Sequence, residues 1–113
     1  MTDRELLELA AKAAGIVNYT FHDGVFQPKC LFVETGSRGG DQGYYWSPLT
    51  DDGDALRLAV RLEIRARYDR RLSIAWVESP FIEVRCDDAV LFDEYAATRR
   101  AIVRAAAEIG RKM

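Results

Sequence analysis

The chain has 113 residues, of which 49% are hydrophobic and 30% are charged, and its formal net charge is −2. This length fits one domain over residues 1–113, and the apolar content can form a core without disulfides or a metal ion. A net-acidic chain is a poor non-specific nucleic-acid binder, because that role needs a concentrated basic surface. No apolar run reaches the ~18 residues that a membrane-spanning helix needs.

Two features of the sequence predict a cytoplasmic protein. The opening stretch MTDRELLELA is acidic where a secretory signal is basic. Cys30 and Cys86 lack the C-x-x-C spacing of redox and metal sites, so we interpret them as buried free thiols in a reducing compartment. We expect no cofactor.

The first helix is predicted at the start of the chain. Thr2 and Glu5 have the spacing of a capping box, in which the two side chains accept hydrogen bonds from free backbone amides of the first turn. One apolar stripe follows, made of Leu6, Leu9, Ala10 and Ala13. Gly15 stands where a helix commonly ends with a positive φ angle.

A β-hairpin is predicted next. The triplet His22-Asp23-Gly24 is typical of a turn, and it separates a short strand at 19–21 from a longer one at 29–34. The stretch TGSRGGDQG at 35–43 is predicted to be a glycine-rich loop.

A second helix is predicted over 51–62, with Leu56, Ala59 and Val60 on its inner face. The period then becomes two, which predicts an antiparallel meander with strands near 64–68, 72–77 and 82–86. The strands at 30–33 and 72–77 are uncharged on both faces, so we expect the middle of the sheet to be covered by a layer above and a layer below. The residues predicted to be buried are Phe32, Val33, Ile74 and Trp76, and those predicted to be exposed are Arg65, Arg67, Glu83 and Arg85.

The last helix is predicted to begin near Asp93, a suitable N-cap residue. Its buried stripe is predicted to comprise Tyr95, Thr98, Ile102, Ala105 and Ile109. The elements together predict an α+β protein, built as a three-layer α/β/α sandwich with a mainly antiparallel sheet of four to five strands and three helices.

Two segments resemble a known family. WSPLTDDGDALRLAV at 46–60 and YAATRRAIVRAAAEIGRKM at 95–113, after the opening MTDRELLELAAKAAGI, resemble the phage ABA sandwich domain family. These are small proteins of phages and prophages. The resemblance implies helices on both sides of a sheet and a phage origin. It implies no activity and no catalytic residues, because the family has none that are established.

The stretch GSRGGDQGYYW at 36–46 is the better candidate for binding. Its glycines leave backbone amides open, Arg38 adds a positive charge, and Tyr44, Tyr45 and Trp46 offer rings on which a nucleotide-like ligand could stack. It lacks the G-K-[ST] of a phosphate-binding loop, so a plain connecting loop is the simpler interpretation.

Asp51, Asp52 and Asp54 are weak candidates for a metal site, since their spacing is not that of an EF-hand. They stand where the start of a helix favours acids, so we interpret Thr50 or Asp51 as its N-cap. If His22 converged with these acids, the site could be that of a small phosphodiesterase. A histidine beside a turn glycine is more simply a turn residue.

The remaining basic residues leave two interpretations open. Arg65 and Arg67 on one strand, with arginines of the last helix, form either an anion-binding patch or a solvated charged face.

The favoured interpretation is a non-catalytic binding module. It would be an accessory protein of a phage or prophage that binds a host protein or a small nucleotide-like ligand in the host cytoplasm, for instance against a host defence. A small phosphodiesterase is the alternative. A DNA-binding protein is a weaker one, because no helix-turn-helix pattern is present. The free strand edge at 82–86 predicts a homo-oligomer, with a two-fold dimer favoured.

Overall fold

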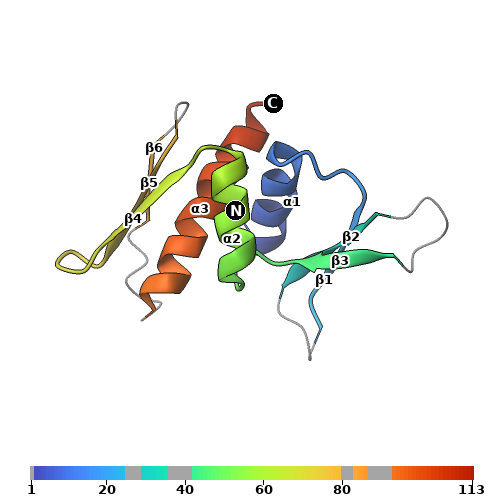
Figure 1. Ribbon diagram of the computed structural model, residues 1–113, viewed down its shortest axis with the longest axis horizontal. Coiled ribbons are helices and arrows are strands. Elements are labelled where there is room, and N and C mark those ends of the chain that lie inside the picture. Colours follow the sequence, from blue (N-terminus) through green and yellow to red (C-terminus); the bar gives the residue numbers. More distant parts are fainter. Residues whose placement is uncertain (1, 25–28, 36–41, 80–82, 87–92) are drawn as a thin grey trace.

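The computed structural model describes residues 2–24, 29–35, 42–79, 83–86 and 93–113 (Figure 1). In this part of the chain there are three helices: α1 (Asp3–Ala13), α2 (Asp52–Arg61) and α3 (Glu94–Arg111). The strands form two antiparallel sheets. Sheet A consists of β1 (Tyr19–His22), β2 (Cys30–Glu34) and β3 (Gly43–Trp46), and sheet B of β4 (Arg65–Asp69), β5 (Ile74–Glu78) and β6 (Glu83–Cys86).

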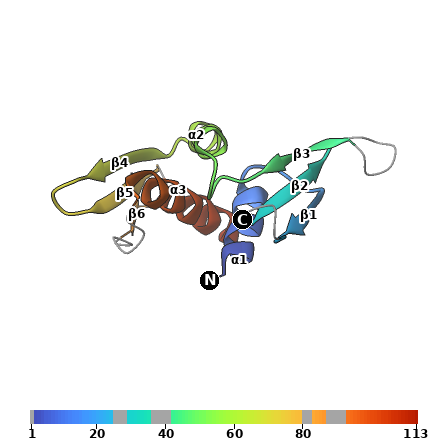
Figure 2. The same cartoon turned by 90° about the horizontal axis from the view of Figure 1, so that it is seen from below.

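The predicted α+β class, its three helices and its antiparallel pairing are confirmed. The prediction of one sheet with four to five strands was too simple, because the described strands divide between two sheets of three. The helices lie between these sheets (Figures 1 and 2). None of the described helices is long and apolar enough to cross a membrane.

α3 is the central element of the fold. It packs on α1, on α2 and on the strands of sheet B. Its buried residues are mostly small: Ala97, Ala101, Ile102, Val103, Ala105, Ala106, Ala107 and Gly110. The predicted stripe was therefore too narrow, and at its first position Tyr95 is 61% exposed. A single apolar stripe suits a helix covered on one side, whereas α3 is covered on several.

The three helices begin at predicted N-cap residues. Thr2, Asp51 and Asp93 accept hydrogen bonds from first-turn amides at 3.2, 2.8 and 2.8 Å. Gly15 follows α1 with a φ angle of 80°, as predicted for the helix end. These local signals were sufficient because each cap involves residues within three positions of one another.

Sheet A has an inner face toward the core and an outer face. Leu31 lies opposite Trp46 and Val33 opposite Tyr44, so these four side chains share the inner face. Of these, Leu31, Val33 and Trp46 are buried. The strand β3 was not predicted, because its short stretch GYYW follows the glycine-rich loop and leads directly into a helix.

Sheet B has β5 at its centre and β4 at its edge, as the charge pattern predicted. Ile74, Ala75 and Val77 are buried. Four predictions for single side chains are confirmed: Val33 and Ile74 are buried, and Arg65 and Arg67 are exposed. Two are corrected, because Phe32 and Trp76 are half-buried instead of buried. The side chains of Glu83 and Arg85 lie outside the described residues.

α2 turns only one of its three predicted inner residues, Ala59, to the core. Ala55, Leu58 and Ala59 are buried, whereas Leu56 and Val60 are 64% and 71% exposed. Both sets have helical spacing, and we assigned the larger side chains to the interior. Instead Ala55 and Leu58 are the buried neighbours of Ala59, on the side of α2 that packs on the alanine-rich α3.

Candidate functional site

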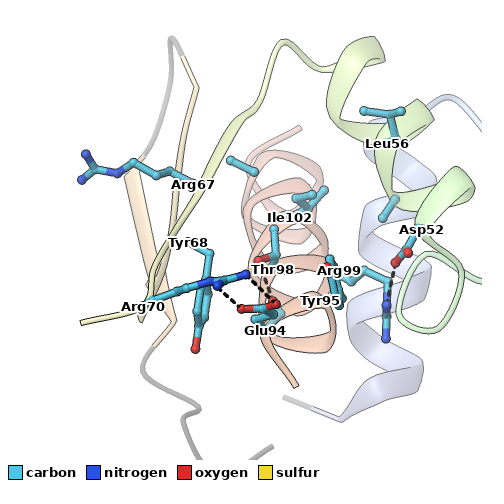
Figure 3. Close-up of a pocket in the computed structure, with 12 residues that line it drawn as sticks. Asp52, Leu56, Arg67, Tyr68, Arg70, Glu94, Tyr95, Thr98, Arg99 and Ile102 are labelled. Carbon is cyan, nitrogen blue, oxygen red and sulfur yellow. Dashed lines mark hydrogen bonds and ion pairs between the residues drawn. The ribbon is translucent and has the colours of Figure 1, made fainter. Parts of the chain in front are cut away.

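A groove lies between α2 and β4, and α3 forms its floor (Figure 3). The cavity has a volume of about 520 Å³. Leu56 lines it from α2, Ala66 and Tyr68 from β4, and Ile102 from α3. Because strand residues alternate, Arg67 points away from the cavity, and the small Ala66 leaves space beside the strand.

Polar contacts join α3 to both walls of this groove. Arg99 donates to Asp52 of α2 at 2.6 Å and to the Leu49 carbonyl at 3.0 Å. Arg70, just after β4, pairs with Glu94 of α3 at 3.2 Å. These contacts bridge α3 to α2 on one side of the groove and to the end of β4 on the other.

The rim of the groove carries two exposed apolar side chains. Leu56 stands on the α2 side, and Tyr95 stands near the start of α3. Single exposed apolar residues are ordinary, but two on the rim of one cavity whose floor is apolar are typical of a binding surface. Sequence reasoning missed both as site residues, because their helical spacing placed them in the predicted core.

β4 contributes a free strand edge to the same groove. In the described part of the chain it pairs with β5 alone, and it is the strand of sheet B nearest α2 (Figure 2). In an antiparallel pair, every second residue turns its N–H and C=O groups away from the neighbouring strand. These groups of β4 can pair with another chain.

The predicted binding stretch is divided between two faces of sheet A. Tyr44 and Trp46 lie on the inner face, and Tyr45 lies on the outer face, because β3 is a strand. Trp46 is buried, whereas both tyrosines are exposed. One stacking site made of all three rings is therefore not formed. Arg38 lies outside the described residues.

Tyr44 instead lines a second cavity, of about 580 Å³, together with Arg57 and Arg61 of α2. Arg57 donates to Asp54 at 2.9 Å. Arg61 has no ion-pair partner among the described residues. Its guanidinium lies near the C-terminal end of α1, where the helix dipole favours a cation.

The three acids at the start of α2 have separate protein partners. Asp51 caps the helix, and Asp52 pairs with Arg99. Asp54 accepts a hydrogen bond from the Ser47 amide at 2.9 Å and also binds Arg57. These contacts make the stretch a structural joint. Among the described residues, no group of three or more acidic, histidine or cysteine side chains is placed to hold a metal ion.

His22 ends β1 instead of lying in the predicted turn. Its ring contacts Phe32 and Tyr45 with centroid distances of 6.3 and 6.0 Å, on the outer face of sheet A. Asp54 shares a cavity with Tyr44, which lies on the inner face. His22 and Asp54 therefore do not converge as a phosphodiesterase site would require.

Cys30 is a buried free thiol, as predicted, and is 2% exposed. Burial raises the pKa of this thiol, which keeps it protonated and unreactive near neutral pH. Cys86 belongs to β6, and its side chain lies outside the described residues.

Comparisons with protein-family models, with curated proteins and with solved structures found no match. We therefore infer the function from the groove and its chemistry.

Proposed function

We propose that the protein is a non-catalytic binding module that holds a segment of a protein partner in the groove between α2 and β4. The supporting observation is the pair of exposed apolar side chains, Leu56 and Tyr95, on the rim of this cavity. Covering such surface stabilises a complex by about 25 cal/mol per Å² of apolar area, before the costs of association. With the resemblance to the phage ABA sandwich family, the partner is a host protein, bound by an accessory protein of a phage or prophage.

The test is affinity capture from host lysate with wild type, Leu56→Glu and Val60→Glu. Both residues are strongly exposed on α2, so neither change should unfold the protein, but only Leu56 lines the groove. We expect a protein that wild type and Val60→Glu both capture, and that Leu56→Glu does not. Capture that is the same with all three forms, or no specific capture, would overturn the proposal.

A small aromatic anion, such as a nucleotide, is a second candidate ligand. The second cavity supports it, because the exposed Tyr44 ring lies there with the guanidinium of Arg61, which has no ion-pair partner in the described part of the chain. The test is calorimetric titration with adenosine monophosphate of wild type, Arg61→Ala, Tyr44→Ala and the outer-face control Tyr45→Ala. Weaker binding by the first two variants alone supports this site, and equal binding by all four forms excludes it.

The phosphodiesterase alternative has less support than either binding role. Its acids are held by Arg99, by the Ser47 amide and by the helix cap, and His22 lies on the far face of sheet A. A general base must reach the proton that it abstracts, directly or through one water.

A further inference from the structure

The free edge of β4 lies beside the groove, which β4 residues line. β4 spans five residues, and among the described residues its only strand neighbour is β5. The next strand of a sheet would lie about 4.8 Å from β4, on the side toward α2. A chain in that position would cover the groove floor while pairing its backbone with β4.

The side of the added strand that would face α3 meets an apolar surface. Ala66 and Tyr68 are the β4 residues that point toward α3, and Ile102 lies below them. Side chains of an added strand that lie opposite Ala66 and Tyr68 would enter the groove, because directly opposed residues share a face. Leu56 would cover them from the α2 side.

The outer face of the same position is basic. Arg65 and Arg67 alternate with the inner residues and are both exposed. Arg65 has a loose ion pair with Glu78 at 3.9 Å, and Arg67 lies 5.8 Å from the centre of the Trp76 ring. Neither arginine is held by a buried partner, so both can turn to acidic side chains on an added strand.

We propose that the groove binds an extended peptide that joins sheet B as a fourth strand beside β4, with apolar residues toward Ile102 and acidic residues opposite Arg65 and Arg67. This inference rests on the proposed function and specifies its partner: a segment in which apolar and acidic residues alternate. Main-chain pairing supplies affinity in such strand addition, and the alternating side chains supply specificity.

A second copy of this protein is not the occupant that the charges favour. If β4 of two copies paired about a two-fold axis centred on Ala66, Arg65 of each copy would lie opposite Arg67 of the other. Like charges directly opposite one another in a sheet are destabilising. An acidic strand meets no such repulsion.

The test uses an acetylated, amidated octapeptide that alternates valine and glutamate. One matched probe is the counterpart that alternates valine and lysine. Two others are forms of the valine–glutamate peptide in which every second amide is N-methylated: the valine amides in one form and the glutamate amides in the other, which define the two N-methyl phases. We expect the valine–glutamate peptide to bind at least about tenfold more tightly than the lysine peptide, and the double variant Arg65→Glu/Arg67→Glu to reverse this preference. Only one N-methyl phase should abolish binding, since only one edge of the peptide pairs with β4.

Amide hydrogen exchange supplies the backbone readout. In the free protein, alternate amides of β4 should exchange fast, because they face away from β5. These same amides should become protected when the peptide binds. Leu56→Ser should weaken binding, and Val60→Ser, at a position that is also strongly exposed but does not line the groove, should not.

The outcomes separate this inference from the proposed function. Strand addition is overturned if the peptide binds and Leu56→Ser weakens that binding, while the β4 amides stay unprotected and both N-methylated peptides bind as well as the parent. The groove then remains a binding site. A second outcome is that wild type captures a protein, Leu56→Glu does not, and neither octapeptide binds at millimolar concentration. This outcome overturns only the proposal that the bound segment alternates apolar and acidic residues. Capture unaffected by Leu56→Glu, with no peptide bound, overturns both.

Discussion

At the scale of single residues, the end of α2 contains a glutamate in a conformation that suits glycine. Glu63 has a φ angle of 57°. Its amide donates to the Val60 carbonyl, and the Ile64 amide donates to the Ala59 carbonyl, which is the Schellman pattern of a helix end. A residue with a Cβ atom loses about 1–2 kcal/mol in this left-handed region.

We therefore expect Glu63→Gly to be more stable than Glu63→Ala by about 0.5–1 kcal/mol. Both variants lose the same charge, so the difference in their stability reports the cost of the left-handed backbone conformation. The expected difference of about 0.5–1 kcal/mol already allows for the greater flexibility of glycine in the unfolded chain. Urea denaturation of the two variants measures it. Equal stability would show that the left-handed conformation at this position costs nothing.

The buried thiol of Cys30 and the half-buried hydroxyl of Tyr19 should make the stability of the protein sensitive to alkali. Burial raises the pKa of the Cys30 thiol above its ordinary value of 9.0. Burial, followed by the nearby charge of Glu8, raises the pKa of the Tyr19 hydroxyl above 10.0. The folded protein therefore keeps both protons to higher pH than the unfolded chain. Their contribution to stability is complete below the ordinary pKa values and is lost as pH rises through the raised ones.

The change Cys30→Ala should remove the thiol's part of this dependence. We expect the free energy of unfolding of wild type to fall more between about pH 8 and about pH 10.5 than that of Cys30→Ala, whatever the difference between them at the lower pH. Denaturation curves at both pH values measure the two slopes. Parallel losses would mean that Cys30 titrates alike in the folded and unfolded states.

At the scale of elements, the contact between α1 and α3 depends on one glycine. A Cβ atom on Gly110 would lie 2.0 Å from the Leu9 carbonyl oxygen and 2.9 Å from its carbon. Both are backbone atoms, so the clash cannot be relieved by turning a side chain. The helices would have to move apart and lose packing along their shared surface.

We expect Gly110→Ala to lower the free energy of unfolding by about 1–3 kcal/mol, the usual cost of overpacking, although alanine is the better helix former. Gly24→Ala is the matched control, because no atom of the described residues beyond its chain neighbours lies within 4 Å of the added Cβ. Its effect should stay within about 0.5 kcal/mol. Thermal or urea unfolding compares the two, and a neutral Gly110→Ala would contradict the close approach.

The elements show how far local sequence patterns reach. Thr2 and Asp93 could be identified as caps because a cap depends on its nearest neighbours in the chain. The orientation of α2 could not, since Leu56 and Ala55 both belong to stripes with helical spacing, and only the small residues of α3 decide which faces inward. The short strand β3 likewise depends on pairing with β2 more than on its own four residues.

At the scale of the whole molecule, the candidate site could not be predicted from the sequence, because it is assembled from three distant segments. Leu56, Tyr68 and Tyr95 meet at one groove only after α2, β4 and α3 have packed. The aromatic stretch at 44–46 looked like a site because its rings are adjacent in the chain, yet strand alternation sends them to opposite faces. The division into two sheets could not be predicted either, because the alternation of apolar and polar residues along a strand does not depend on which sheet the strand joins.

The predicted two-fold dimer stays a prediction, and the two edges of sheet B differ in how well they suit it. β4 has two arginines at alternate positions, which would lie opposite those of a second copy in a pair centred on Ala66 and would repel them. β6 forms the opposite edge, and the sequence has Glu83 and Arg85 two positions apart along it. In a two-fold antiparallel pair centred on Val84, Glu83 of each copy would lie opposite Arg85 of the other, so the charges would attract.

Light scattering coupled to size exclusion tests this dimer. We expect a mass of about twice the 12.8 kDa of one chain at tens of micromolar, on the order expected for a weak dimer to form. Glu83→Arg alone and Arg85→Glu alone should shift the protein toward the monomer, because each places like charges opposite one another, and the double exchange Glu83→Arg/Arg85→Glu should restore the dimer. A wild-type mass near one chain would contradict the dimer itself. A dimer that none of the variants weakens would move the contact away from β6, because a β6 pair cannot avoid these two positions.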